Sequence, residues 1–123
     1  MSAWTNDELE RMAAAEELQL ASMRRDGTLR GPVTIWVVRD GDDLYVRSVN
    51  GRGSSWFRGA QDRHEGRVEA GGVERDVSLV EADDVDDAVD AAYRAKYSHR
   101  YPGIVPSIVA AEARAATLRL VPR

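Results

Sequence analysis

The sequence of 123 residues, the usual size of one domain, predicts a single α+β domain over residues 1–123. Its centre is expected to be a small, mostly antiparallel β structure of the barrel type. The segment VTIWVVR, residues 33–39, is apolar on both faces and needs cover on both sides, as a strand in a barrel wall does. Residues 33–49 and 66–80 each contain two strand-like segments around turn residues, which predicts two hairpins. One apolar stripe over residues 85–97 predicts a helix that flanks them.

The first helix is predicted over residues 6–15 by the residues that precede and open it. Thr5 and Glu8 have the spacing of a capping box, in which each side chain bonds the backbone N–H of the other residue. Trp4 and Leu9 have the spacing of a hydrophobic staple, which fixes the direction in which the chain enters the helix. The domain is therefore expected to open with a capped helix.

Two strand patterns follow this helix. Residues 16–25 alternate between apolar and polar side chains, which predicts a half-buried strand that ends at an Asp-Gly turn. Residues 33–39 are the strongest strand pattern in the chain, because β-branched and aromatic residues fill them. The turn formers of residues 40–43 lead into LYVRSV, so residues 33–49 predict a hairpin with 33–39 as its first strand.

Turn-forming residues 50–55 predict a loop followed by a short helix that ends near Asp62. Ser54 or Ser55 is the expected N-cap, because a serine hydroxyl accepts a hydrogen bond from the first turn of a helix. Residues 66–80 then predict the second hairpin, around a Gly-Gly turn.

The last third of the chain contains the clearest helix, residues 85–97, with Asp84 as its expected N-cap. An irregular stretch follows it. A short Ala/Glu helix is then expected over residues 110–116 and a final strand over 117–121.

Composition limits the classes of function. The net charge of −4 argues against general nucleic-acid binding, because duplex affinity comes largely from clustered cations that neutralise phosphate. The absence of cysteine excludes disulfides, thiolate metal sites and a cysteine nucleophile, and it agrees with a reducing compartment. No apolar run approaches the roughly 20 residues that span a bilayer, and the amino terminus is acidic where a secretory signal would be basic. We therefore expect a cytoplasmic protein with neither a nucleic-acid nor a membrane partner.

Five segments carry a family resemblance: RGPVTIWVV, LYVRSVNGRGSSWFRGA, GRVEAGG, AAYRAKY and the terminal TLRLVPR. Together they resemble the DUF2255 family over nearly the whole chain. That family is similar to the FMN-binding split-barrel group, which includes pyridoxamine-phosphate-oxidase-like and deazaflavin-dependent nitroreductase-like proteins. The resemblance implies a small antiparallel split β-barrel with flanking helices, a homodimer, and FMN or a deazaflavin (F420) as cofactor.

The resemblance also implies a place for the cofactor phosphate, on basic and hydroxyl residues near a hairpin strand and the loop after it. The residues at the matching positions are Arg47, Ser48, Asn50, Arg52, Ser54 and Ser55. Arginine forms charge-assisted bidentate bonds with phosphate, and Gly51 and Gly53 let backbone amides approach closely. Trp36 and Trp56 can flank a planar ring, or they can pack in the core as most aromatic residues do.

A second group of residues, Lys96, Tyr97 and Tyr101, can bind a substrate and donate protons to a reacting group. The alternative is that the tyrosines pack on the core and Lys96 extends to solvent. His64 and His99 belong to no metal-binding spacing, so no metal site is expected, and His64 is expected in an exposed turn.

Two classes of function follow from these residues. One is an oxidoreductase or flavin carrier that binds FMN or a deazaflavin and acts on a small organic molecule. The other is a cofactor-free protein that uses the same pocket to bind a small molecule or to catalyse a non-redox step on it.

Overall fold

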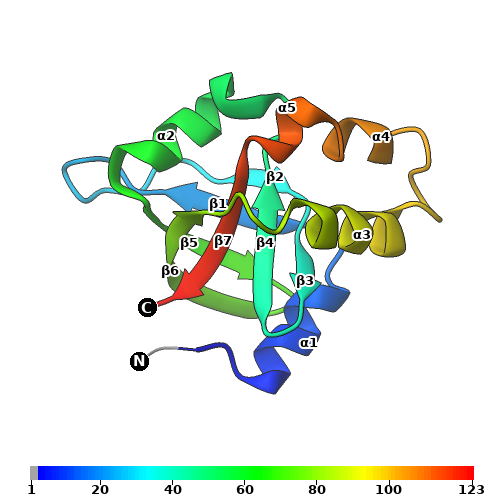
Figure 1. Cartoon of the computed structure of the whole chain (residues 1–123). Helices are drawn as coiled ribbons and strands as arrows, with labels where there is room; N and C mark the ends of the chain where they lie inside the picture. Colours follow the sequence, from blue (N-terminus) through cyan, green and yellow to red (C-terminus); the bar gives the residue numbers. More distant parts are fainter. Residues whose placement is uncertain (1–2) are drawn as a thin grey trace.

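The strands of the protein form one antiparallel sheet in the order β2-β1-β5-β6-β7-β4-β3 (Figure 1). The computed structural model describes residues 3–123, so Met1 and Ser2 of the predicted domain lie outside the described residues. The strands are β1 Leu18–Ser22, β2 Val33–Ile35, β3 Val38–Asp40, β4 Asp43–Arg47, β5 Glu65–Ala70, β6 Val73–Glu81 and β7 Thr117–Pro122. The helices are α1 Asn6–Ala14, α2 Ser55–Arg63, α3 Asp86–Tyr97, α4 Val105–Ile108 and α5 Ala111–Arg114, with a 3-10 turn η1 at Gly51–Gly53.

The two edges of this sheet are consecutive in the chain. Strand β2 forms one edge and β3 forms the other, and only Trp36 and Val37 separate them. Because Val38 follows Ile35 by three positions, their Cα atoms lie at most about 11 Å apart, so the sheet has to curl until its two edges approach each other. The sheet is therefore strongly curled, as expected for the split barrel that the sequence predicted.

The prediction of one strand over residues 33–39 is wrong. Strand β2 pairs with β1, where Ile35 lies opposite Leu18, whereas β3 pairs with β4, where Val38 lies opposite Tyr45. The predicted hairpin 33–49 is thus a shorter hairpin of β3 and β4. The segment is apolar on both faces, as expected, because it forms both edge strands of the sheet and packs against α3.

Two clusters of buried side chains lie on the two faces of the sheet. The cluster inside the barrel includes Leu20, Leu44, Val46, Phe57, Val68, Leu79, Leu118 and Leu120. The cluster between β3, β4 and the outer helices includes Val38, Tyr45, Val89, Tyr93, Tyr97, Val105 and Ile108. Side chains alternate along β4, so Leu44 and Val46 enter the barrel while Tyr45 and Arg47 face the helices.

The helices cover different parts of the barrel (Figure 1). Helix α1 lies at one end, and α2, α5 and α4 lie at the other, with α3 packed against β3. None of the helices within residues 3–123 is long and apolar enough to cross a membrane.

The expected caps of the first two helices are confirmed. Thr5 Oγ1 accepts from the Glu8 backbone N–H at 3.1 Å, and Glu8 Oε1 accepts from the Thr5 N–H at 2.9 Å. Ser54 caps α2 by accepting from the Phe57 N–H. The indole of Trp4 is buried and donates to the Leu120 carbonyl at 2.9 Å, which ties the start of α1 to β7.

The expected cap of the clearest helix is wrong. Helix α3 begins at Asp86 with Val85 at the N-cap position, and no side chain caps it, so Asp84 has no such role. The irregular stretch contains the short helix α4, whose first turn holds Pro106, a residue that helix starts tolerate. The last predicted helix is shortened to α5.

The turn between β5 and β6 approaches α1 closely. Gly71 has φ +59°, and a Cβ there would lie 2.3 Å from the Arg11 carbonyl oxygen. Gly41, in the turn between β3 and β4, has a similar φ of +61° but no atom within 4 Å of a Cβ position. Substitutions at Gly41 and Gly71 therefore distinguish the stability lost through a positive φ from the stability lost through a steric clash.

We predict that Gly41→Ala lowers the free energy of unfolding by about 1–2 kcal/mol, the cost of a left-handed conformation for an L-residue. Gly71→Ala should lower it by about 1–3 kcal/mol more, because the added methyl group overpacks the contact with α1. Urea denaturation of both variants measures the difference. Equal losses would show that α1 moves aside freely.

Candidate functional site

A cavity of about 270 Å³ is built from β2, the end of β4, α2 and α4. It is lined by Thr34, Ile35, Trp36, Arg47, Val49, Trp56, Ile104 and Ile108. Val49 and Ile104 are the large hydrophobic side chains that stay exposed in the described chain, at 42% and 50%, and both belong to this cavity. Three of the predicted cofactor residues, Trp36, Arg47 and Trp56, come together here.

Trp36 is fixed in the cavity wall by an aromatic stack. Its ring lies 4.0 Å from the Tyr97 ring, centroid to centroid, with an angle of 5° between the planes. The ring of Tyr101 lies 5.3 Å away at a tilt of 38°. Aromatic pairs of this kind add to the energy of burial, so Trp36 is held in one orientation.

Trp36 and Val37 form the bend between β2 and β3, and side chains of α3 form hydrogen bonds with the backbone there. The Val37 N–H donates to Tyr97 Oη at 3.3 Å, and Lys96 Nζ donates to the Val37 carbonyl at 2.6 Å. Tyr97 Oη donates to the Glu16 carbonyl at 2.6 Å. These bonds satisfy backbone groups that a break in the sheet would otherwise leave unpaired in the interior.

The predicted substrate residues Lys96, Tyr97 and Tyr101 therefore lie together, next to Trp36, but none of them is among the residues that line the cavity. Burial lowers the pKa of the Lys96 amine to about 8 and raises the pKa of the Tyr97 hydroxyl. Tyr101 donates to the Glu16 carboxylate, a bond that raises the pKa of Tyr101. The polar atoms of all three residues bond protein groups at the bend.

Arg47 is a buried polar centre between β4 and the outer helices. Its side chain is 0% exposed, and Nε donates to Thr117 Oγ1 at 2.9 Å. Its Nη1 donates to the Asp90 carboxylate and to the Ile108 carbonyl, and its Nη2 donates to the carbonyl and carboxylate of Asp86. All five N–H donors of the guanidinium are thus taken by the protein. We expected Arg47 to contact a ligand phosphate, but this geometry assigns it to the scaffold of the cavity.

The charge of Arg47 is balanced by a carboxylate that is shared with a second arginine. Asp90 is 7% exposed, and its second oxygen lies 3.2 Å from Arg114 Nε. Arg114 also donates to Asp87 at 2.7 Å. The network joins β4, β7, α3 and α5, which fixes the wall that Arg47 and Ile108 give to the cavity.

The loop after β4 is ordered by its own side chains. Ser48 is buried, and its hydroxyl lies 2.6 Å from the Ser54 hydroxyl, which caps α2. Asn50 is exposed and precedes η1. The predicted phosphate residues Ser48 and Ser54 thus bond each other.

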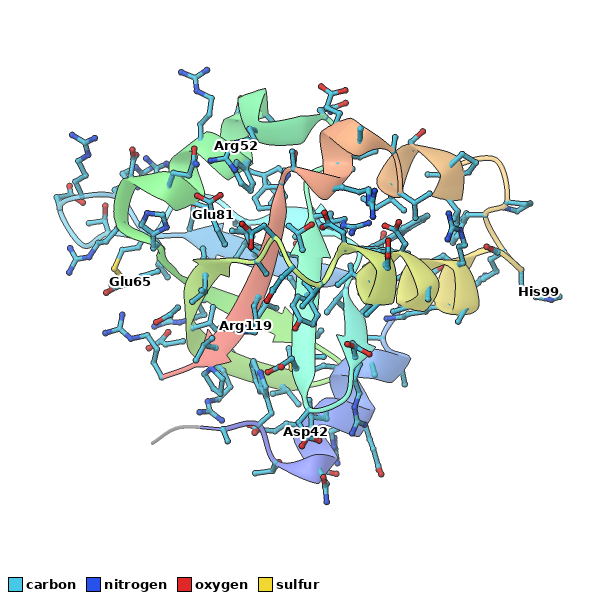
Figure 2. The ribbon with its side chains drawn as sticks, in the orientation of Figure 1. Asp42, Arg52, Glu65, Glu81, His99 and Arg119 are labelled. Atoms are coloured by element: carbon cyan, nitrogen blue, oxygen red, sulfur yellow. The ribbon has the colours of Figure 1, made fainter. Side chains whose placement is uncertain are left out.

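Arg52 lies beside Glu81, and the two side chains point toward each other below α2 (Figure 2). Its Nη1 donates to Glu81 Oε1 at 2.5 Å and to the Ala115 carbonyl at 3.0 Å. The guanidinium also covers the Phe57 ring, 5.2 Å from its centroid. The hydrogen bond with Arg52 lowers the pKa of Glu81. Arg52 is therefore part of a half-exposed ion pair and is not among the residues that line the cavity.

The remaining candidates lie elsewhere. Ser55 lines a separate polar hollow with Arg58. His64 is exposed, as expected, at the end of α2, and His99 projects from the loop after α3 (Figure 2). No cluster of three or more metal-ligating side chains occurs within residues 3–123.

The apolar part of the cavity was not among the predicted site residues. Val49 lies two residues after Arg47, in the turn that follows β4. Ile104 and Ile108 have helical i, i+4 spacing within the stretch that was taken as irregular.

The family model described as "Uncharacterized protein conserved in bacteria (DUF2255)" matches residues 8–120, in agreement with the resemblance seen in the sequence. No curated protein matches the chain by sequence.

Several solved structures have the same fold at low identity. A conserved hypothetical protein from Mycobacterium tuberculosis is 13% identical with a TM-score of 0.69, over 99% of this chain and 82% of that one. HutZ, a heme storage protein from Vibrio cholerae, is 15% identical with a TM-score of 0.62, over 93% and 86%. A protein described as F420 reductase is 17% identical with a TM-score of 0.56, over 93% and 90%. The α+β split-barrel fold that the sequence predicted is confirmed.

We predict that Arg47→Met lowers the free energy of unfolding by about 3–5 kcal/mol, because it leaves Asp90 buried without its main partner. Arg67→Met is the matched control, since Arg67 on β5 forms an exposed ion pair with Asp76, worth at most about 1 kcal/mol. Thermal and urea denaturation measure both. A small loss for Arg47→Met would contradict its role in the scaffold.

Proposed function

The chain belongs to the DUF2255 family. We propose that it is a cytoplasmic, flavin-type oxidoreductase that acts on a small organic molecule. We propose FMN or a deazaflavin as its cofactor, with the planar ring in the cavity between Trp36 and Trp56. The observation that carries the proposal is an apolar cavity with these two rings on its wall and two exposed aliphatic side chains at it.

The size and the lining of the cavity fit the ring of such a cofactor. Ligand pockets usually hold about 300–1,000 Å³, so 270 Å³ suits a ring system whose polar tail extends outside. The walls are aromatic and aliphatic, and the polar side chains among them are Thr34 and Arg47. The donors of Arg47 are all bonded to the protein, which leaves an apolar surface for a ring.

The residues that line the cavity also bear on whether a flavin or a heme fits there. One structural relative is described as a heme storage protein and another as F420 reductase. Heme iron needs an axial ligand, most often histidine. His64 and His99 are not among the residues that line the cavity. The residues present therefore support a flavin or deazaflavin better than a heme.

The residues of the chain would orient the ring and exclude water. The Trp36 ring, fixed by Tyr97, offers a flat surface, and Trp56, set edge-on to Phe57 at 5.8 Å, bounds the cavity from α2. When bound, the cofactor supplies hydride chemistry. Ile104, at the rim, would shield that chemistry from solvent.

We further propose that the protein is a homodimer in which the partner covers the cavity. Val49 and Ile104 are apolar side chains that remain exposed at one place, which is a feature of interaction surfaces. A chain of this size encloses only part of a cofactor. A symmetric partner would supply the missing wall.

A cofactor-free function is the second candidate. The cavity has no free polar donor from Arg47, and an apolar small molecule would need none. Such a protein would bind the molecule itself or catalyse a non-redox step on it.

We predict that the wild-type protein binds FMN or F420 with a dissociation constant in the micromolar range, and that Trp56→Leu weakens binding roughly three- to tenfold. The expected loss corresponds to one aromatic contact, about 0.5–1.5 kcal/mol. Trp4→Phe is the control, because Trp4 is buried at β7 and not at the cavity. Cofactor fluorescence and calorimetry measure the affinities.

Failure of the wild type to bind either cofactor at about 100 μM would exclude the redox proposal and leave the cofactor-free function. Equal affinities of the wild type and Trp56→Leu would place the ring outside this cavity.

We predict that the wild type is a dimer at micromolar concentration and that Ile104→Asp makes it monomeric, because a carboxylate would be buried without a partner. Ala91→Asp, on the exposed side of α3, should leave the dimer intact. Light scattering after size-exclusion chromatography gives the masses. A monomeric wild type would refute the homodimer.

A further inference from the structure

A second hollow, of about 600 Å³, lies between the loop that joins β1 to β2 and helix α2. Its charged wall consists of Arg25, Arg30, Arg58 and Asp62, so three guanidinium groups face one carboxylate. This excess of positive charge occurs in a chain whose net charge is −4. The hollow is thus distinct from the apolar cavity in chemistry as well as in lining.

Arg30 is held rigidly in this wall. Its side chain is 29% exposed, and Nη1 donates to the Met23 and Gly59 carbonyls at 3.2 and 3.1 Å. Its Nη2 donates to Asp62 Oδ2 at 2.5 Å. A Cβ at position 59 would lie 3.1 Å from Arg30 Nε, so the glycine leaves the space that the guanidinium occupies. Arg30 is therefore a fixed cation at the edge of the hollow, with Asp62 as its partner.

The other two arginines keep their charge largely uncompensated. Arg25 is 84% exposed and lies 3.8 Å from the same Asp62 carboxylate that already accepts from Arg30. Arg58 is exposed, and no carboxylate of residues 3–123 lies within 4 Å of its guanidinium. The loop that carries Arg25 is ordered, because Arg63 donates to the Arg25 carbonyl at 3.1 Å.

Neutral donors and the helix itself favour the same type of ligand. Ser55 is the first residue of α2, a helix of nine residues, and it lines the hollow together with Gln61, whose amide also donates to Glu81 at 3.4 Å. Hydroxyl and amide groups complete the coordination of phosphate oxygens that guanidinium groups begin. The positive end of the helix dipole lies at Ser55.

We propose that this hollow is a binding site for a dianionic phosphate group, either a phosphate monoester or a diphosphate, with Arg58 and Arg25 as its main contacts. The first turn of α2 places Ser55 in this hollow and Trp56 in the apolar cavity. The phosphate therefore belongs either to the tail of the cofactor in that cavity or to a separate phosphorylated molecule. The first case rests on the proposed function, and the second does not.

The test uses pyrophosphate as the probe, titrated by calorimetry at constant ionic strength. Arg58→Gln and Arg25→Gln should each weaken its binding about tenfold, the loss expected for one charge-assisted hydrogen bond. Arg94→Gln is the matched control, because Arg94 is also an exposed helical arginine with no carboxylate within 4 Å in the described chain. It should bind pyrophosphate like the wild type. Circular dichroism verifies that all three variants are folded.

FMN and riboflavin, which differ by the phosphate, distinguish the two sources. If the site serves the cofactor, Arg58→Gln weakens FMN binding, leaves riboflavin binding unchanged, and pyrophosphate competes with FMN. If the site serves a separate molecule, Arg58→Gln weakens pyrophosphate binding alone. Arginine-dependent pyrophosphate binding without any flavin binding would refute the proposed function and keep this site.

Two results would overturn the site. The first is a combination of two observations: the wild type does not bind pyrophosphate at about 10 mM, and the Arg58→Gln variant binds FMN as tightly as the wild type does. The other is that Arg94→Gln weakens binding as much as Arg58→Gln, which would show that only the overall charge matters.

Discussion

The structure depends on a bend of two residues, Trp36 and Val37, through which one chain segment supplies both edges of the sheet. A bend inside a folded protein exposes backbone groups that have no strand to pair with, and leaving them unpaired is costly. Tyr97 and Lys96 provide the partners from α3. The connection between the two sheet edges and the packing of α3 are therefore coupled through these bonds, and the stack of Tyr97 on Trp36 belongs to the same contact.

On the other wall of the cavity, Arg47 likewise connects several elements through buried hydrogen bonds. Burying a guanidinium costs several kcal/mol, which only complete hydrogen bonding and a paired carboxylate offset. Its partners come from β7, α3 and α4, so it also fixes where those elements meet. Removal of either partner of this network would leave a buried charge uncompensated.

Local patterns in the sequence predicted most elements but not their long-range pairing. The capping box at Thr5 and Glu8 is a contact between near neighbours, and it was found where the pattern placed it. The division of residues 33–39 between two strand partners depends on contacts with Leu18 and Tyr45, which no local pattern contains. The hydrogen-bond partners of Arg47 were not predicted for the same reason. An arginine that pairs with Asp90 across 43 positions looks identical in sequence to one that binds phosphate.

The two sheet edges have a further consequence, for aggregation. Open edges are where foreign strands add to a sheet, and soluble proteins protect them by shortening or covering them. Here the edge strands β2 and β3 have three residues each and are joined at the bend. A neighbouring molecule thus finds almost no free backbone to extend. A chain with a seven-stranded sheet can in this way expose an apolar cavity without also offering a template for intermolecular β-structure.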